Sequence, residues 1–550
     1  MIGILGSPTF DNPALSIEGA IVNGAQNGSA GWLQALLDYG HEPDGYQIFE
    51  MPDQRKGHPG HSRANIASLD DLPQALRRGR LTILHSPMGP DVGRMASVVH
   101  RCSAKPIPVT AIQYSVSYTY GNLFWFDMLT GPVAPWDCVV CTSQASRRAI
   151  EILTGHLREK IAANVGVPEA SLRMSRLATI PLGVEPRRFW EPSDQPRARQ
   201  LLGLPQEPHI VLSVGRLSPI NKADLFVLIR ALRRIHDATP CPPFPMLVLA
   251  GSDRVGYSHT IKQLSREAGV GDHVVVFPNL IDALLPAMYA AADVFVAPSD
   301  SVGETFGITL TEAMMSRLPV VASEWDGFPE VVEDGVTGYL VKTAWGGVDG
   351  DLCLASELRG AQPLEHFRLA QATVLDEGGL VAAVSRLLES QDRRISLGEA
   401  GRRRAEERFS WRVVVQQYEA LWSELRQEGA GGPARTGSTT PALPYHRVFE
   451  HYASRRVQDG DVIVVRPRAL LTWKVVRGYT AIMDAGINDA ILERLLRQVE
   501  SRRRVGEVVR GDDQMRMHLM WLAKHGFVDI VPVDARGVFA EDMPSPMLAR

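Results

Sequence analysis

The chain has 550 residues, 45% of them hydrophobic, which is enough for about three domains with full cores. Its 58 basic and 62 acidic side chains give a formal net charge of −4, which excludes a bulk electrostatic attraction to nucleic acid or anionic lipid. Five scattered cysteines, no signal segment and no apolar run of roughly 18 residues predict a cytoplasmic protein without a disulfide framework.

Apolar runs alternate with helical stretches in the first part of the chain, which indicates a parallel sheet covered by helices. We expect strands at Ile2–Leu5, Leu81–Leu84, Val109–Ile112 and Cys138–Cys141, and helices at Gly31–Tyr39 and Ser143–Leu153. Cys138 and Cys141 form a C-x-x-C pair. Because the pair falls inside a strand and not at a helix start, we expect no redox or metal role for it.

Two places in this first region are candidates for contact with a ligand. The Gly-rich run from Asn23 to Gly31 precedes a helix, so the backbone at Gly28 and Ser29 can approach a ligand, and the alternative is an ordinary turn. His85 follows a strand at the carboxyl edge of the sheet, where ligands collect, and the alternative is a structural histidine.

A second alternation of strands and helices follows the first. Strands are predicted at Ile210–Val214, Met246–Ala250, Val274–Phe277, Val294–Ala297 and Val320–Ala322, and helices at Ala223–Ile235 and Leu280–Ala291. The two alternations predict two Rossmann-like domains.

The loop and helix before the last of these strands are the most informative part of the chain. Phe306 and Gly307 form a turn that begins a helix at Ile308, so the amides of Ile308 and Thr309 offer a binding site to phosphate. Glu304, in the loop, can reach a sugar hydroxyl.

A second carboxylate, Glu312, lies on the same predicted helix. Leu310, Ala313 and Met314 share one side of the helix by their spacing, which places Glu312 on the opposite side, outside the core. A carboxylate there can accept hydrogen bonds from the two hydroxyls of a ribose. The alternative is a pair of solvated acids, Glu304 and Glu312, on a surface helix.

A long helix and a linker end the second region. The helix is predicted between Ser410 and Glu428, with its apolar face formed by Trp411, Val414, Val415, Tyr418, Trp422 and Leu425. The stretch Gly429–Pro441 is rich in Gly, Pro, Ser and Thr and predicts a flexible tether.

The region after the tether has the order of elements found in a winged helix. Three helices are predicted around 491–499, 505–509 and 515–522, followed by a strand at Phe527–Val531. Arg502 to Arg504 can contact phosphate, but Asp512 and Asp513 at the start of the third helix are unfavourable for DNA. We expect a protein-docking or dimerisation role, with a structural cap and DNA binding as alternatives.

Three stretches carry a resemblance to a known family. They are Ala297–Val341, with Glu304 and Glu312 spaced as E-x7-E, the stretch Ser213–Asp224, with Arg216 and Lys222, and Ile180–Val184. The chain from about Met1 to Gly429 resembles the retaining family-four glycosyltransferases of GT-B fold.

The resemblance implies a role for each matching residue. Arg216 and Lys222 are implied to bind the diphosphate of a nucleotide sugar, and Arg216, Lys222 and Glu304 to be catalytic. The implied donor site consists of Arg216, Lys222, Glu304, Phe306, Gly307, Ile308, Thr309 and Glu312. On the acceptor side the candidates are Gly28, Ser29, His85, Gln113 and Tyr114.

The chain departs from the family at three points. Many relatives carry a His where this chain has Gln113, Tyr114 and Ser115, Glu185 stands where Asp is usual, and Arg317 and Leu318 precede Pro319 where a Gly is common. At Arg317 we expect a local adjustment of the turn. Acidic Asp-Gly-Asp groups at Asp349 and Asp459 are interpreted as turns, so we expect neither a metal ion nor another cofactor.

The predicted protein is thus an α/β chain of GT-B fold. Its domains are an acceptor domain at 1–185, a nucleotide-sugar domain at 186–409, a helix at 410–428 that crosses back to the first domain, a linker at 429–443 and an accessory α+β domain at 444–550. The predicted activity is transfer of a hexose-type sugar, with retention and without metal, to an acceptor that is a small molecule, glycan, lipid or protein. A nucleotide-sugar epimerase is disfavoured by the E-x7-E context, and a catalytically silent scaffold remains as the alternative.

Overall fold

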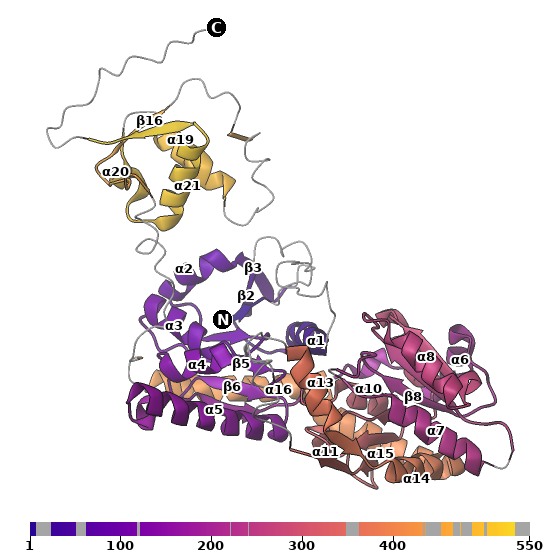
Figure 1. Ribbon diagram of the computed structural model, residues 1–550. Helices are drawn as coiled ribbons and strands as arrows, with labels where there is room; N and C mark the ends of the chain where they lie inside the picture. Colours follow the sequence, from indigo (N-terminus) through magenta and orange to yellow (C-terminus); the bar gives the residue numbers. More distant parts are fainter. Residues whose placement is uncertain are drawn as a thin grey trace. The chain divides into compact units, whose positions relative to one another are not determined.

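The computed structural model describes residues 1–6, 24–50, 62–117, 122–220, 222–239, 241–347, 362–432, 435, 453–465, 473–474, 487–499 and 503–533. The contacts divide the chain into two compact units (Figure 1). The first contains Met1–Glu50 and Pro59–Thr440, and the second contains Met51–His58 and Pro441–Arg550. Within the described residues, no helix combines the length and apolar character that crossing a membrane requires.

The first half of the first unit is a parallel sheet of seven strands in the order β3-β2-β1-β4-β5-β6-β7. The strands are β1 (Ile2–Leu5), β2 (Tyr46–Glu50), β3 (Ala64–Ser68), β4 (Ile83–Ser86), β5 (Val109–Gln113), β6 (Cys138–Cys141) and β7 (Arg176–Thr179). Helix α1 (Gly24–Tyr39) covers one face, and α2 (Leu72–Arg77), α3 (Val92–Cys102), α4 (Asn122–Thr130) and α5 (Gln144–Val165) cover the other. The four predicted strands are confirmed, and β2, β3 and β7, which mix polar with apolar residues, were not predicted.

The second half is a parallel sheet of six strands in the order β10-β9-β8-β11-β12-β13. They are β8 (Ile210–Val214), β9 (Met246–Gly251), β10 (Val274–Pro278), β11 (Val294–Ala297), β12 (Val320–Ser323) and β13 (Gly338–Val341). All five strands predicted here are confirmed. In both sheets the strand order reverses beside the first strand, and ligands bind at the carboxyl ends of strands at such a reversal.

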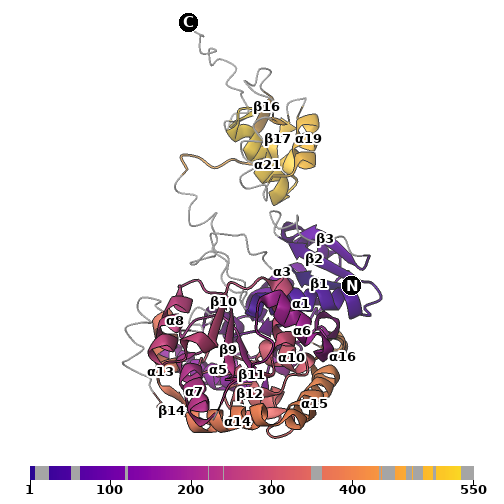
Figure 2. The same cartoon turned by 90° about the vertical axis from the view of Figure 1, so that its right-hand side faces the viewer.

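Helices enclose this second sheet on both faces (Figure 2). One face is covered by α7 (Phe226–Ala238), α8 (Tyr257–Glu267) and α14 (Glu377–Glu389). The other is covered by α6 (Gln195–Leu202), α9 (Leu285–Ala291), α10 (Ile308–Met315) and α15 (Gln391–Phe409). The short elements α11 (Phe328–Val331), β14 (Thr343–Trp345), α13 (Gln362–Gln371) and β15 (Thr373–Leu375) complete this half.

Helix α16 (Trp411–Ala430) follows the second half but packs against the first, beside α1 (Figure 1). The indole Nε1 of Trp422 donates a hydrogen bond to Thr110 Oγ1 in β5, at 3.1 Å. Tyr418 and Trp422 contact the ring of Trp32 from α1. The predicted helix that crosses back is confirmed.

The start of the predicted tether is bound to the first half, which corrects the prediction of a free linker from Gly429. Helix α16 includes Gly429, and the Arg435 guanidinium, almost fully buried, forms an ion pair with the buried carboxylate of Asp137. Arg435 also donates to the carbonyl oxygens of Ile107 and Pro132. The composition of the tether gave no sign of these long-range contacts.

Arg317 shows how the chain makes its turn without the usual glycine. Its φ of +56° lies in the left-handed region, which costs a non-glycine residue free energy. The neighbouring backbone is close, since a Cβ on Gly398 would lie 2.1 Å from the Arg317 carbonyl oxygen. Ion pairs with Glu191 and Glu399 hold the Arg317 side chain. The adjustment is local, as expected.

The buried thiols of β6 lie on opposite faces of the first sheet. Cys138 packs in the core beside α1 and α16, and Cys141 in the core beside α2 to α5. Burial raises the pKa of both thiols to about 12. Two thiols separated by the sheet and held protonated are structural, in agreement with the prediction.

The described residues of the second unit include a small antiparallel sheet and the helices α19 (Asp489–Gln498), α20 (Val505–Val509) and α21 (Asp513–Lys524). The sheet has the order β17-β16-β18, formed by β16 (Val462–Val465), β17 (Arg503–Arg504) and β18 (Val528–Val531). The three helices and the last strand are confirmed, whereas β16 was not predicted. Asp512 caps α21 by accepting hydrogen bonds from the amides of Gln514 and Met515.

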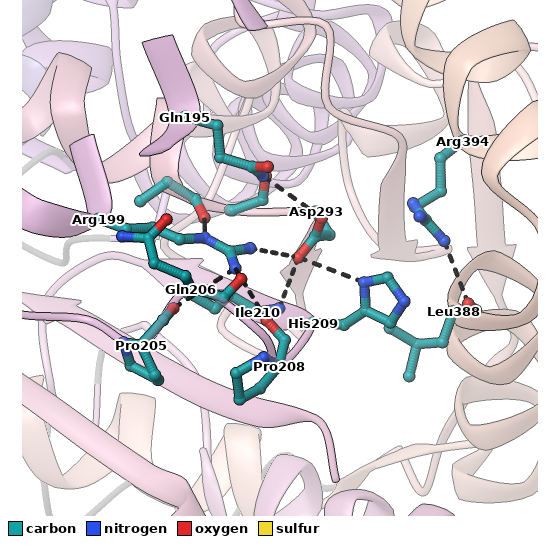
Figure 3. Close-up of polar contacts among 12 residues, drawn as sticks. Gln195, Arg199, Pro205, Gln206, Pro208, His209, Ile210, Asp293, Leu388 and Arg394 are labelled. Carbon is teal, nitrogen blue, oxygen red and sulfur yellow. Dashed lines mark hydrogen bonds and ion pairs between the residues drawn. The ribbon is translucent and has the colours of Figure 1, made fainter. Parts of the chain in front are cut away.

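A buried polar cluster around Arg199 of α6 joins the starts of two strands in the second half (Figure 3). Its guanidinium forms an ion pair with Asp293 at 2.8 Å and donates to the carbonyl oxygens of Ala291 and Pro208. Asp293, just before β11, also accepts from the first amide of β8, Ile210, at 2.7 Å. The Arg199 and Asp293 side chains are only 5% and 12% exposed. If one of them is removed, water therefore has little access to the charge that remains.

Replacement of Arg199 tests this cluster. Arg199→Met leaves the Asp293 carboxylate buried without its cation, so we expect the free energy of unfolding to fall by about 3 to 5 kcal/mol. Arg230→Met is the matched control, because it breaks an ion pair of the same half in which Arg230 is 45% exposed. That change should lower the free energy of unfolding by less than about 1 kcal/mol. Urea unfolding of both variants gives the comparison, and equal losses would contradict it.

Candidate functional site

A cleft of about 790 Å³ lies between the two halves of the first unit. Its walls come from the carboxyl ends of strands in both sheets, from helices α1, α4 and α10, and from the segment that connects the halves. This is the position that the two strand-order reversals favour for a ligand. Of the predicted site residues, the following line it: Gln113, Tyr114, Arg216, Lys222, Glu304, Phe306, Gly307, Ile308, Thr309 and Glu312.

Lys222 and Glu304 form an ion pair on the second-half wall of the cleft. The Lys222 ammonium, in the loop after β8, donates to Glu304 Oε2, while Glu304 Oε1 accepts from the amides of Thr305 and Gly307. Burial raises the pKa of Glu304, but the Lys222 ammonium and the backbone amides outweigh it and hold the pKa below its usual range. Glu304 is therefore an anion at neutral pH, only 12% exposed and fixed in one orientation.

Helix α10 begins at the cleft. Gly307, directly before the helix, has a φ of +92°, and a Cβ there would lie 2.5 Å from the ring of Phe328, so only glycine fits. Ile308 and Thr309 form the first turn and line the cleft. A helix start beside Lys222 and Arg216 is an electropositive wall suited to phosphate.

Glu312 is buried, which corrects the prediction that it lies on an exposed side of its helix. Every residue of α10 from Leu310 to Met315 is buried, because neighbouring helices cover the side that the spacing left open. The Tyr289 hydroxyl of α9 donates to Glu312 Oε2 at 2.8 Å. Burial raises the pKa of Glu312 to about 7, although Tyr289 and Arg188 lower it. Since Glu312 lines the cleft, the pair is not the solvated surface pair of the alternative interpretation.

Gln113 and Tyr114, at the end of β5, lie on the opposite wall. Gln113 is 4% exposed, and its Oε1 has no hydrogen-bond partner within the described part of the chain. The carbonyl oxygen of Tyr114 accepts a hydrogen bond from Thr305 Oγ1 at 2.6 Å, next to Glu304. The two walls of the cleft therefore touch beside Glu304.

Gly28 and Ser29 lie inside α1 and not in a loop, which corrects the predicted Gly-rich loop. A Cβ on Gly28 would lie 2.9 Å from the ring of Tyr114, and the side chain of Ser29 is fully buried beside the Tyr114 hydroxyl. Both residues are absent from the cleft wall. Gly28 and Ser29 instead pack against the Tyr114 side chain.

His85 is a structural histidine, the alternative stated for it from the sequence. It lies inside β4, is fully buried, stacks on Trp32 at 4.4 Å and contacts Thr110 Oγ1 through Nδ1 at 2.7 Å. Burial lowers its pKa to about 3, so it is neutral. The strand begins and ends two residues later than predicted, which places His85 among core aromatics.

Two acids after β12, Asp326 in the loop and Glu330 in α11, were missed by the sequence analysis. Asp326 has a φ of +52°, and burial, together with Glu304 and Glu330, raises its pKa to about 8. Glu330 accepts hydrogen bonds from the amides of Gln144 and Ala145, the first residues of α5 in the other half. Only the three-dimensional structure connects these segments, which are about 180 residues apart in the chain.

The described residues contain no group of three or more His, Cys, Asp or Glu side chains placed to hold a metal ion. Asp459 and Asp461 flank a turn and pair with Arg516 and Arg455, as the interpretation of this motif as a turn requires. The group at Asp349 lies outside the described residues.

Comparison with known proteins adds a family to the second half. Residues 194–345 match the family model described as glycosyl transferases group 1. The chain is 32% identical over 229 residues to a D-inositol 3-phosphate glycosyltransferase of Corynebacterium aurimucosum, covering 42% of this chain and 46% of that protein. It is 29% identical over 304 residues to a GDP-mannose-dependent alpha-(1-6)-phosphatidylinositol monomannoside mannosyltransferase of Mycolicibacterium smegmatis, covering 53% and 68%. The chain thus spans 46% of the length of the Corynebacterium relative.

Solved structures agree with the fold of the first unit. The Anabaena protein Alr3699/HepE in complex with UDP is similar with a TM-score of 0.52 and 18% identity, covering 77% of this chain and 100% of that one. The same protein in complex with UDP and glucose gives a TM-score of 0.50 at 18% identity, covering 77% and 99%. The predicted GT-B fold is confirmed.

Proposed function

We propose that the protein is a glycosyltransferase that moves a hexose-type sugar from a nucleoside diphosphate sugar to an acceptor hydroxyl, with retention and without a metal ion. The observation that carries the proposal is the convergence of Lys222, Glu304, Glu312 and the start of α10 on one cleft. These residues lie in or beside the segment 194–345 that matches the group 1 glycosyl transferases.

The positive wall is assigned to the diphosphate. Arg216 and Lys222 supply two cations, and the amides of Ile308 and Thr309 supply oriented donors. When the bond between the sugar and the diphosphate breaks, negative charge grows on the leaving oxygen, and preorganised donors lower the barrier most at that point. With this wall in place, a bound cation is not required to neutralise the leaving group.

The two carboxylates are assigned to hydroxyl groups of the donor. Glu312, deep in the cleft beside Tyr289, accepts hydrogen bonds from the ribose. Glu304, held as an anion by Lys222, accepts from hydroxyls of the sugar. The sugar then lies between Glu304 and the opposite wall at Gln113 and Tyr114.

The reaction proposed at this position is a direct transfer. The acceptor oxygen forms a bond to the anomeric carbon, the bond from that carbon to the diphosphate oxygen breaks, and the acceptor proton passes to the departing diphosphate. Attack and departure on the same face give retention. The contact between Thr305 and Tyr114 limits the entry of water, which would otherwise hydrolyse the donor.

A nucleotide-sugar-binding scaffold is the second candidate. It is favoured by the absence, at Gln113 and Tyr114, of the His that many resembling enzymes carry. In such a scaffold the donor would bind in the cleft without turnover. The two candidates differ in one measurable quantity, the release of nucleoside diphosphate.

A donor panel tests the proposal. Purified protein is given UDP-, GDP- and ADP-sugars with a chelator, and nucleoside diphosphate release is measured beside donor binding. We expect release from one donor without metal, and we expect Glu304→Gln to reduce it about 100-fold or more. Glu267→Gln, which changes an exposed acid of α8, is the matched control and should retain activity. Binding without release, in the presence of a cell extract as acceptor source, would favour the scaffold.

The pH dependence of donor binding tests the assignment of Glu312. Because burial raises its pKa to about 7, the empty site is partly protonated at neutral pH, and ribose hydroxyls favour the ionised form. Donor affinity should therefore rise from about pH 6 to about pH 8, by at most about tenfold per unit below the pKa. An intact nucleotide sugar is the probe, since its diphosphate does not titrate there.

Glu312→Gln should flatten this profile. An unchanged slope in the variant would contradict the assignment and direct attention to Asp326, whose pKa is about 8.

We propose that the accessory unit, which includes residues 444–550, docks a large acceptor or a second copy of the chain. A chain ending at Thr440 should retain donor release with a small acceptor and lose most transfer to the large native acceptor. A chain ending at Gly429 also loses Arg435, the partner of Asp137, so it should unfold at a lower temperature. Equal transfer to the native acceptor by the full chain and the Thr440 form would contradict docking.

A further inference from the structure

The acceptor side of the cleft has a composition of its own. We define the acceptor wall as Gln34, Asp38, Met88, Pro90, Gln113 and Phe124, all from the first half and all lining the cleft. None of these residues lies within 194–345, the segment that matches the family model. The family model therefore bears on the donor half alone, and we infer the acceptor from the wall itself.

The charges on this wall are negative. Asp38 is exposed to the cleft and held by a hydrogen bond from Gln34 Nε2 at 2.9 Å. Glu185, in the connecting segment, also lines the cleft and accepts from the Tyr39 hydroxyl at 2.7 Å. Among the described residues of the first half, no Lys, Arg or His lines the cleft.

Two nearby cations, Arg188 and Arg94, form ion pairs with carboxylates. Arg188, in the connecting segment, lines the cleft but is paired with Asp282 at 2.5 Å. Arg94, on α3 behind Phe124, is bound to Asp127 at 2.7 Å. A phosphate on the acceptor would therefore meet two carboxylates and no cation of the first half, which is unfavourable.

The remaining surface of the wall is apolar. Met88 and Pro90 from the loop after β4 face the cleft together with Phe124 of α4. The same helix exposes Leu123 by 60% and Phe126 by 47%, one turn apart on one side. An apolar surface thus continues from the cleft along α4, and an acceptor with an apolar portion would bury it.

One polar atom on this wall selects the reacting group. Gln113 Oε1 is buried, lines the cleft and has no partner within the described residues. A carbonyl-type oxygen accepts a hydrogen bond from a hydroxyl and repels the oxygens of a phosphate. Gln113 directly precedes Tyr114 in the chain. The Tyr114 carbonyl oxygen accepts a hydrogen bond from Thr305 Oγ1, and Thr305 follows Glu304.

We propose that the acceptor is an uncharged, hydroxyl-bearing molecule with an apolar portion, and not a phosphorylated one. The proposal rests on the proposed transferase function and names the substrate class for its site. The hydroxyl lies at Gln113, where its oxygen bonds to the anomeric carbon as the bond to the diphosphate breaks and its proton leaves with the nucleoside diphosphate. The apolar portion lies on Met88, Pro90 and Phe124.

Four matched acceptors test this proposal with the full chain and the donor found active in the panel. They are glucose, octyl β-glucoside, 4-nitrophenyl β-glucoside and glucose 6-phosphate. We expect kcat/KM for at least one apolar glucoside to exceed that for glucose about tenfold, and that for glucose 6-phosphate to fall about tenfold below it. Preference for glucose 6-phosphate, or transfer to no neutral member while donor hydrolysis continues, would overturn the proposal.

Two variants locate the effect on the wall. Phe124→Ala should remove most of the preference for the apolar glucosides over glucose, and Asp38→Lys should raise kcat/KM for glucose 6-phosphate relative to glucose about tenfold. Glu159→Lys, an exposed site on α5, makes the same change in net charge outside the cleft and should leave the ratio unchanged. Equal effects of Asp38→Lys and Glu159→Lys would overturn the charge argument.

Failure of this proposal is distinguishable from failure of the proposed function. If no donor is bound or hydrolysed, the transferase assignment fails. If donor is consumed and the phosphorylated acceptor is preferred, the transferase assignment stands and only the acceptor class is wrong.

Discussion

The carboxylate of Glu330 accepts hydrogen bonds from the first two amides of α5, and the geometry of the cleft depends on this contact between the two halves. A helix of 22 residues has unpaired amides and a partial positive charge at its start, so an anion is stabilised there. The contact from Thr305 to the Tyr114 carbonyl oxygen adds a second tie close by. Helix α16 adds a third, since it belongs to the second half in sequence and to the first in packing. Glu304 lies in the loop between these ties, so its distance from the acceptor wall is set by them.

Three acids crowd the second-half side of this junction, and their charges are compatible only because they differ in protonation. Lys222 holds the pKa of Glu304 below its usual range, and Glu330 accepts hydrogen bonds from the first two amides of α5. Burial and the nearby charges of Glu304 and Glu330 raise the pKa of Asp326 to about 8. A neutral Asp326 at physiological pH removes the repulsion that a third carboxylate would impose. The loop after β12 thus connects the reaction centre to the junction between the halves.

The sequence predicted those parts of the protein that depend on local order. Five of the six strands of the second half, the helix start at Ile308 and the loops that carry Lys222 and Glu304 follow from periodicity and from turn residues. The buried environment of Glu312 did not follow, because it depends on Tyr289 of another helix. The surroundings of His85 and the binding of Arg435 did not follow for the same reason: their partners, Trp32 and Asp137, are about 50 and 300 residues away in the chain. Residue spacing within one element cannot report such contacts.

The distribution of charge along the cleft gives a direction to the proposed reaction. The cations Arg216 and Lys222 lie with the start of α10 on the second-half side, beside the carboxylates of Glu304 and Glu312, whereas the described cleft residues of the first half include Asp38 and no cation. A nucleotide sugar placed across this field is oriented with its diphosphate toward the second half and its sugar toward the first. The negative charge that develops on bond breaking therefore stays where cations already lie, and a neutral glycoside forms where they are absent. Charge separation within the site thus orients the donor before reaction and holds the nucleoside diphosphate apart from the product afterwards.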